Sequence, residues 1–461
     1  EDGIHTELQV YVDVNKAVKF TNIRIKNWSG RPRRISVTGY VEWVLGDLRS
    51  KTGMHVSTMI DPVTGALLAR NLYNKEFNDR ICFFDISDKS RTVTGDRAEF
   101  IGRNGSLSNP EAMEKIRLSG RTGAALDPCG ALQTIFDLSE GQEHEVMFML
   151  GASVGMDETV RLIQEFKTSG AATTALMEVY HYWDHALGII KVDTPDHALN
   201  VLANGWLMYQ TLACRFNARS GFYQSGGAFG FRDQLQDSMA LLHSKPELVR
   251  QHIMRCASRQ FREGDVQHWW HPPMGNGVRT KCSDDYLWLP YVTAAYVQFT
   301  GDMSILDESA RFLEARVLNA DEESNYDLPG ISVMSATLYE HCILAIKNGL
   351  RFGENGLPLM GSGDWNDGMD RVGIEGKGES VWLAFFLFDV LTQFAGLARS
   401  RGDAALADKY ELEAGRLVAN PPPELAARFA TAVSVDESYA AALFHTGWFV
   451  ESLMTQTLII H

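Results

Sequence analysis

The chain has 461 residues, of which 45% are hydrophobic and 22% are charged, and this globular composition excludes a disordered or fibrous protein. Its formal net charge is −15. Because an acidic protein repels phosphate backbones, we expect no nucleic-acid partner, whereas a neutral partner such as a sugar meets no such repulsion.

The first third of the chain has the pattern of β-strands. From Leu8 to Val12 apolar residues alternate with polar ones, and further strand-like runs follow as far as about Gly151. The run Val146–Leu150 is continuously apolar, as in a strand that is buried on both faces. Many strands with few helical patterns predict an antiparallel β-sandwich, to which we assign residues 1–155.

The period of the apolar residues changes after Gly155, where Asp157 and Glu158 are expected to open a helix. A second helix is predicted over Met177–Trp183, and together they define a helical linker over residues 156–194.

The remaining residues, 195–461, are predicted to form a nearly all-helical domain. Pro195 stands near the start of its first helix. Val381–Ala398 should form a strongly apolar helix that ends at Gly402. Long loops rich in Gly, Trp and Asp separate these helices, and long loops in a compact helical domain usually carry function.

The first such loop runs from Tyr223 to Asp237 and carries three charged candidates for sugar binding, Arg232, Asp233 and Asp237. Its glycines let the backbone approach a ligand, and the charged side chains offer donors and acceptors for hydroxyl groups. The alternative is an ion pair of Arg232 with Asp233 or Asp237 that only steadies the loop.

The second loop combines aromatic rings with two adjacent carboxyl groups. Trp270, His271 and Arg279 are candidates for sugar binding, and Asp284 and Asp285 are candidates for catalysis. If both carboxyl groups are buried they cannot both ionise easily, so one pKa rises and that group can protonate a glycosidic oxygen. The alternatives are that Ser283 caps a helix with both Asp residues at its positive end, or that nearby His residues form a metal site. No standard metal-ligand spacing is present, and we predict no metal and no cofactor.

The third loop carries Asp364, Trp365 and Asp367, followed by Glu379. A calcium loop is the competing interpretation, but the final Glu of an EF-hand is missing. Since the three loops share the same character, we predict that they line one pocket.

These loops resemble glycoside hydrolase family 94, the inverting phosphorylases of cellobiose, chitobiose and related β-linked sugars. The matching strings are GFRDQLQD (Gly230–Asp237), CSDDYLWLPYV (Cys282–Val292) and GLPLMGSGDWNDGM (Gly356–Met369). VQHWWHPP and LARNLYNKEF also match, and they are similar to the phosphorylase-like C-terminal region of cyclic β-1,2-glucan synthases.

The resemblance implies an N-terminal β-sandwich, a helical linker and an (α/α)6 barrel, with inorganic phosphate as co-substrate. In the family, one carboxylic acid protonates the glycosidic oxygen, and phosphate attacks the opposite face to give α-glucose 1-phosphate. The matching motif places that acid at Asp284 or Asp285, with Asp284 favoured. Arg232 and Asp237 would hold the sugar on the phosphate side of the scissile bond.

The resemblance fades after about Ser400, so we expect a fragment of a longer protein, with an incomplete barrel and weak activity. The leading function is phosphorolysis or synthesis of β-1,2-glucan. The competing functions are an inverting hydrolase, with Asp364, Asp367 or Glu379 as base, and a non-catalytic glucan-binding segment. We expect the chain to form a homodimer or to be part of a larger membrane-bound synthase.

The cysteine pattern bears on the compartment. Six cysteines without a CxxC pair predict reduced thiols and a cytoplasmic protein, or the cytosolic part of an inner-membrane synthase. No signal peptide and no apolar run long enough to span a bilayer are identified, so we expect no direct membrane insertion.

Overall fold

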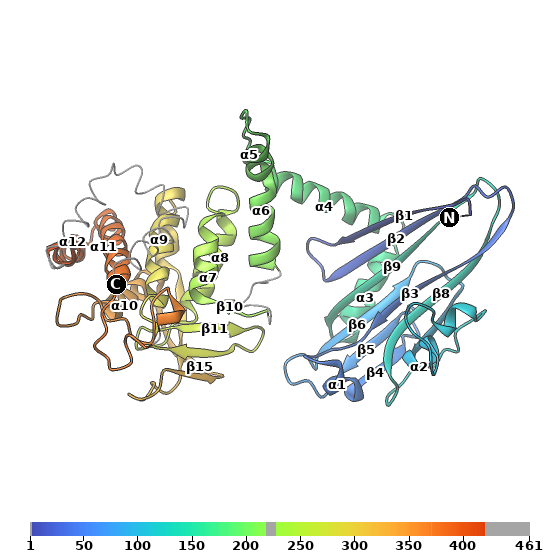
Figure 1. The fold of residues 1–461 in the computed structure, drawn as a ribbon, viewed down its shortest axis with the longest axis horizontal. Coiled ribbons are helices and arrows are strands. Elements are labelled where there is room, and N and C mark those ends of the chain that lie inside the picture. The colour runs from blue at the N-terminus through green and yellow to red at the C-terminus, as the bar shows by residue number, and fades with distance from the viewer. Residues whose placement is uncertain (1, 218–226, 370, 420–461) are drawn as a thin grey trace. The chain divides into compact units, whose positions relative to one another are not determined.

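The computed structural model describes residues 2–217, 227–369 and 371–419. Within the chain, Glu1–His185 and Ala186–His461 form two compact units (Figure 1). The expectations for the segment after Asn420, and for the start of the first loop at Tyr223, lie outside the described residues.

The first unit consists of two antiparallel sheets. A six-stranded sheet has the order β1-β2-β9-β6-β5-β4, and a three-stranded sheet has the order β3-β8-β7. The strands are β1 (Ile4–Val12), β2 (Val18–Asn27), β3 (Arg33–Glu42), β4 (Val56–Ile60), β5 (Leu67–Asn71), β6 (Arg80–Ile86), β7 (Arg91–Asp96), β8 (Pro128–Leu138) and β9 (Glu143–Val154). Two short helices, α1 (Arg49–Thr52) and α2 (Arg97–Ile101), lie in the connections.

Apolar side chains fill both faces of the six-stranded sheet. On one face, Phe84 and Phe148 pack with Val37 and Leu132 of the three-stranded sheet. The other face is covered by α3 (Gly155–Lys167) and the start of α4 (Ala171–Leu187), whose side chains join Phe20, Phe83 and Met149 in a second core. β9 is therefore buried on both sides, which explains its unbroken apolar run.

The two helices after the sandwich extend further than the sequence indicated. The second, expected over Met177–Trp183, spans Ala171–Leu187. α3 packs on the sheet as part of the first unit, and the division between the units falls near the end of α4.

The second unit is mainly helical. Its helices are α5 (His197–Val201), α6 (Leu207–Gln210), α7 (Phe231–Met239), α8 (Pro246–Ala257), α9 (Trp288–Thr300), α10 (Leu338–Gly349), α11 (Val381–Arg401) and α12 (Ala404–Ala419). A kink at Asn204 and Gly205, within Leu202–Trp206, precedes α6, and a π-helical turn over Thr211–Asn217 follows it.

The expectation of a nearly all-helical second domain was wrong for its long loops, which pair with one another. β10 (Phe229–Gly230), β11 (Gln267–His271), β12 (Asn276–Thr280) and β14 (Ser324–Asp327) form a four-stranded sheet. β13 (Ser309–Glu314) pairs with β15 (Gly330–Thr337). Buried loop backbone must satisfy its N–H and C=O groups, and strand pairing between the loops does so.

Helix α11 forms as predicted and ends at Gly402, which adopts φ 91°. Contrary to the expectation from sequence, α11 is by length and composition apolar enough to cross a membrane, alone among the helices that the structure describes. More than half of its most apolar stretch is buried within the protein, where it packs against α9 and α12. A core helix has the same composition, so this property says little about a membrane.

Candidate active site

Arg232, in the first turn of α7, joins the three loops that the sequence singled out. Its guanidinium Nη1 donates to both carboxylate oxygens of Asp284, at 3.2 and 3.3 Å, and to the backbone oxygen of Asp364 at 3.0 Å. Its Nη2 donates to Asp367 Oδ1 at 2.8 Å. Such a planar fork can hold several acceptors in one fixed geometry. The structure thus brings Arg232, Asp284, Asp364 and Asp367 together.

Asp284 is fully buried at the start of the short 3-10 turn Asp285–Leu287 that leads into α9. Trp288 Nε1 also donates to its Oδ2 at 3.1 Å. Burial is the main cause that raises the pKa of this carboxyl to about 7; Arg232 opposes the rise and the charge of Asp285 adds to it. Near neutral pH the group therefore holds its proton more readily than an exposed carboxyl does.

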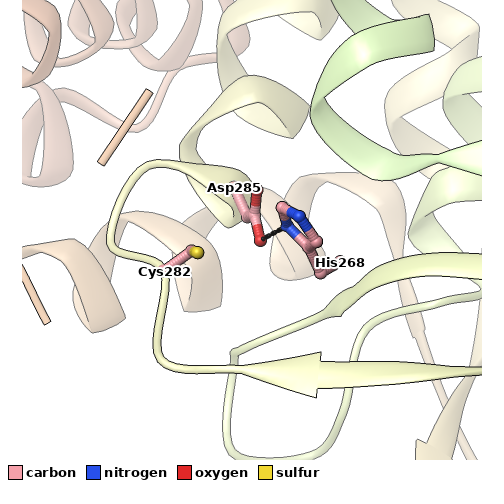
Figure 2. A group of neighbouring side chains, drawn as sticks. All are labelled: His268, Cys282 and Asp285. Carbon is pink, nitrogen blue, oxygen red and sulfur yellow. Dashed lines mark hydrogen bonds and ion pairs between the residues drawn. The ribbon is translucent and has the colours of Figure 1, made fainter. Parts of the chain in front are cut away.

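Asp285 is equally buried, yet its pKa is lowered. Burial favours its protonated form, but the charge and hydrogen bond of His268, together with Arg232 and Thr280, outweigh burial. His268 Nδ1 and Asp285 Oδ2 lie 2.7 Å apart (Figure 2). Burial likewise disfavours the charged form of His268, and Asp285 overcomes it to raise the pKa of His268 to about 9. The two neighbouring carboxyl groups are thereby separated into an acid and an anion.

Ser283 does not cap the helix that follows, so that alternative was wrong. Its hydroxyl donates to the backbone oxygen of Gly363 at 3.1 Å, and its amide donates to the same oxygen at 2.9 Å. These bonds tie the second loop to the third. The pKa values of Asp284 and Asp285 are set by burial and neighbouring charges.

The third loop is fixed by its own hydrogen bonds. Asp364 Oδ1 accepts from the Asn366 amide at 2.9 Å, and Oδ2 accepts from the Ser380 hydroxyl at 2.5 Å. Trp365 Nε1 donates to Gln236 Oε1 of α7 at 3.1 Å. Because both carboxylate oxygens of Asp364 already have protein donors, the calcium alternative has no support here.

The comparisons with known proteins agree with this architecture. Residues 182–421 match the description "Glycosyl hydrolase 94 superfamily, catalytic domain", and residues 1–169 match "Glycosyl hydrolase 94, supersandwich domain". The chain belongs to the glycosyl hydrolase 94 superfamily.

Two curated relatives illustrate the range of this superfamily. A cyclic beta-(1,2)-glucan synthase of Rhizobium meliloti is 40% identical over 87% of this chain and 14% of its own length. An N,N'-diacetylchitobiose phosphorylase of Vibrio furnissii is 26% identical over 89% of this chain and 52% of its own length. The chain therefore spans about half, or much less, of the length of these relatives.

Among solved structures, a bacterial glucoamylase complexed with acarbose matches 90% of this chain and 54% of its own, with a TM-score of 0.52 and 10% identity. At that identity the likeness concerns the fold alone. The glycosyl hydrolase 94 chain thus consists of an antiparallel supersandwich followed by a helical domain of the α/α-barrel type.

Other candidates of this glycosyl hydrolase 94 chain lie outside the Arg232 cluster. Trp270 is 1% exposed and stacks on Phe229, with the Arg259 guanidinium 5.3 Å from its ring, so it offers no face to a sugar. The pleat of β11 turns Trp270 inward, whereas Trp269 stays partly exposed beside Tyr326.

Arg279 and Glu379 make contacts that stabilise the loops in which they lie. The Arg279 side chain is buried and makes ion pairs with Asp265 at 2.6 Å and Glu263 at 3.0 Å. Glu379 Oε1 accepts from the Asn355 amide at 2.8 Å. Both residues thus have local partners outside the Arg232 cluster, and their contact with a sugar stays a prediction.

Three further candidates flank the cluster. Asp237 pairs with Arg215 at 2.5 Å rather than with Arg232, and burial raises its pKa to about 6 against the opposing charge of Arg215. The Asp233 carboxylate lies 3.9 Å from Arg232 Nε. His271 makes an edge contact with Trp269 at 5.3 Å.

The site residues chosen from the sequence did not include His268 or Cys282, although the His residues of this loop were considered for a metal site. His268 lies on β11, and the hairpin that β11 forms with β12 brings it to Asp285, which is 17 residues away in the chain. No local spacing reveals that pairing. The one feature of the sequence that could have pointed to His268 is the density of His and Trp in the QHWWH strand.

Proposed function

We propose that this chain carries the catalytic site of an enzyme that splits, or in reverse builds, a β-linked glucan with inorganic phosphate. The glucan is β-1,2-linked, and the product is α-glucose 1-phosphate. Membership of the glycosyl hydrolase 94 superfamily supports the reaction class, and the 40% identity to a cyclic beta-(1,2)-glucan synthase supports the linkage.

The observation that carries the proposal is the unequal pair of carboxyl groups beside Arg232. A general acid works best when its pKa lies near the working pH, and the pKa of Asp284 is raised to about 7. Asp285 stays ionised through His268, so the exchangeable proton resides on Asp284.

In this mechanism, Asp284 donates its proton to the glycosidic oxygen as the bond between that oxygen and the anomeric carbon breaks. A phosphate oxygen forms the new bond to the anomeric carbon from the opposite face, which inverts its configuration. Phosphate replaces the water of an inverting hydrolase, so no general base is needed. Arg232 then stabilises the Asp284 carboxylate, since its Nη1 already contacts both oxygens.

An inverting hydrolase is the second candidate, and the position of Asp367 is the feature that favours it. The Asp367 side chain is half exposed and pairs with Arg232, whereas Asp364 and Glu379 are held by hydrogen bonds within their loops. Asp367 is thus the carboxylate best placed to activate a water molecule.

The deciding experiment is incubation with a β-1,2-linked gluco-oligosaccharide, with and without phosphate, beside a β-1,4-linked oligosaccharide of the same length. We expect glucose 1-phosphate, in the α configuration by NMR, only when phosphate is present and mainly from the β-1,2 substrate. Phosphate-independent release of glucose would establish the hydrolase instead. Binding of the oligosaccharide without either product would indicate a glucan-binding segment.

We further infer that the protein acts in the cytoplasm, as a homodimer or as part of a larger glucan synthase. The match to 14% of a synthase supports the second assembly. The mass of the native particle, measured by light scattering on the purified chain, distinguishes a monomer from a dimer.

A further inference from the structure

Three side chains of different chemistry converge beside Asp284. His268 comes from β11, and Cys282 and Asp285 come from the segment between β12 and α9. One ligand atom from each lies within 4.8 Å of the others. Figure 2 shows the Cys282 sulfur pointing toward the His268–Asp285 pair.

Imidazole nitrogen, thiolate sulfur and carboxylate oxygen are the ligands of protein-bound Zn²⁺. Three protein ligands leave the fourth tetrahedral position to water or another ligand. Mg²⁺ and Ca²⁺ prefer sites built from oxygen alone, so the sulfur and nitrogen favour a softer, thiophilic ion.

The Asp285 carboxylate supplies an independent indication. Its Oδ1 is buried and has no hydrogen-bond partner among the described residues, although Oδ2 is engaged by His268. A buried carboxylate oxygen that is left unpaired costs free energy, which a bound cation would recover.

A small ion can reach the Cys282 thiol. Cys282 lines a cavity of about 680 Å³ within the second unit, which also borders Thr280 and Ser362. The cavity wall carries more carboxylates than basic side chains, among them Asp321, Glu322 and Glu323, and this excess attracts cations.

We propose that His268, Cys282 and Asp285 form a binding site for a thiophilic divalent cation, with Zn²⁺ the best match. The ion replaces the imidazolium charge of His268 as the counter-charge of Asp285. On binding, the imidazolium loses one proton and the Cys282 thiol loses one, so each ion releases two protons.

Binding should therefore tighten as pH rises, because the cation competes with protons for the imidazole nitrogen and the thiolate sulfur. Arg232 faces both groups and opposes the cation, whereas Asp284 and Asp367 favour it.

The test is titration of the purified, metal-free chain with Zn²⁺ by calorimetry and with Co²⁺ by absorbance, at a pH of about 6 and of about 8. We expect one ion per chain, a thiolate-to-cobalt charge-transfer band, and binding at least tenfold tighter at the higher pH. Cys282→Ser and His268→Gln should each weaken Zn²⁺ binding at least tenfold, and Cys282→Ser should abolish the band. Cys82→Ser, which changes a partly buried thiol of the sandwich, should keep the band.

Absence of the band, or its persistence in Cys282→Ser with unchanged Zn²⁺ affinity, would overturn the site. Circular dichroism confirms that each variant is folded, and Cys282→Ala replaces the serine variant if it is not. Glucose 1-phosphate release with added Zn²⁺ is measured separately. Metal binding without phosphorolysis would remove the proposed function and leave the site, whereas phosphorolysis without metal binding would do the reverse.

Discussion

At the scale of single residues, Asp284 and Asp285 show how burial and partners separate two identical side chains. Both are buried, and burial alone would raise both pKa values. His268 forms a hydrogen bond with Asp285, while the Arg232 guanidinium from which Asp284 accepts is shared with Asp367. The pKa values of the two carboxyl groups therefore differ because their partners differ.

We expect Asp284→Asn to lower phosphorolysis by about 10²–10⁴-fold, the contribution of a positioned general acid. The change keeps the shape of the side chain and removes the proton. A glucoside with a good leaving group needs little protonation, so it should lose much less activity. The measurement is kcat/KM on an oligosaccharide and on an aryl glucoside.

Asp285→Asn is the matched variant, since it makes the same substitution one residue away. A loss that is equal for both substrates in Asp284→Asn would assign that residue to binding or folding. A leaving-group dependence found only in Asp285→Asn would move the acid to the second position.

The pH dependence of phosphorolysis should follow the Asp284 proton. Burial raises the pKa of Asp284 to about 7, although Arg232 opposes the rise. Because the acid must be protonated to react, kcat/KM should fall as pH rises through about 7. The substrate with the good leaving group should lack this alkaline fall. A profile that stays flat to pH of about 9 for both substrates would contradict Asp284 as the acid.

His268 should make the second unit less stable at alkaline pH. Its folded pKa of about 9 lies above the ordinary value of 6.5, because Asp285 outweighs the effect of burial. A group whose pKa is raised on folding stabilises the folded state while it is protonated. The contribution of His268 is therefore complete below pH 6.5 and is lost as pH rises through about 9. The slope for one proton is up to about 1.4 kcal/mol per pH unit.

Urea unfolding between these pH values measures the effect, and His268→Gln should remove the corresponding slope. NMR titration of the imidazole should give a midpoint near 9. An unperturbed midpoint would show that the His268–Asp285 pair does not form in solution.

At the scale of elements, one glycine inside α11 and one at its C-terminal cap should respond to alanine in opposite ways. Gly396 lies inside the helix with open space where a Cβ would project, and Gly402 ends the helix with φ 91°. We expect Gly396→Ala to stabilise by about 0.5–1 kcal/mol through the entropy of the unfolded chain. Gly402→Ala should destabilise by about 1–2 kcal/mol, because a Cβ is strained at that φ.

Each glycine variant is the control for the other, since both add one methyl group to exposed positions near one helix end. Thermal unfolding of the two variants measures the difference. Changes of the same sign would mean that α11 does not end at Gly402 in solution.

Elements whose residues repeat at a regular local period were predictable, and elements made by pairing of distant loops were not. The apolar runs of β9 and α11 reflect their burial, so each was found near its true position. The hairpin of β11 and β12 arises from contacts that no period encodes. That is why Trp270 was placed in the pocket and the pairing of His268 with Asp285 was not predicted. The meeting of Arg232, Asp284 and Asp367, by contrast, followed from the matched composition of the loops.

At the scale of the whole molecule, the sandwich has cores of its own. One lies between its two sheets, and a second lies between the six-stranded sheet and helices α3 and α4. Ile163 and Phe166 of α3 are buried against Phe20 and Phe83, so α3 belongs energetically to the sandwich rather than to a free linker.

This arrangement predicts that a chain ending after His185 folds by itself, whereas one ending after Val154 does not. The shorter chain loses Ile163 and Phe166, which at about 1.5–3 kcal/mol for each buried side chain removes about 3–6 kcal/mol. That is a large part of the about 5–15 kcal/mol that stabilises a typical protein, and the loss also exposes the sheet face around Phe20 and Met149. Urea unfolding should show a cooperative transition for residues 1–185 and aggregation or a much lower midpoint for residues 1–154.

Within the longer chain, Phe166→Ala should cost about 3–5 kcal/mol, while Gln164→Ala on the exposed side of α3 should cost little. Equal stability of the two chains would show that the sandwich ends before α3.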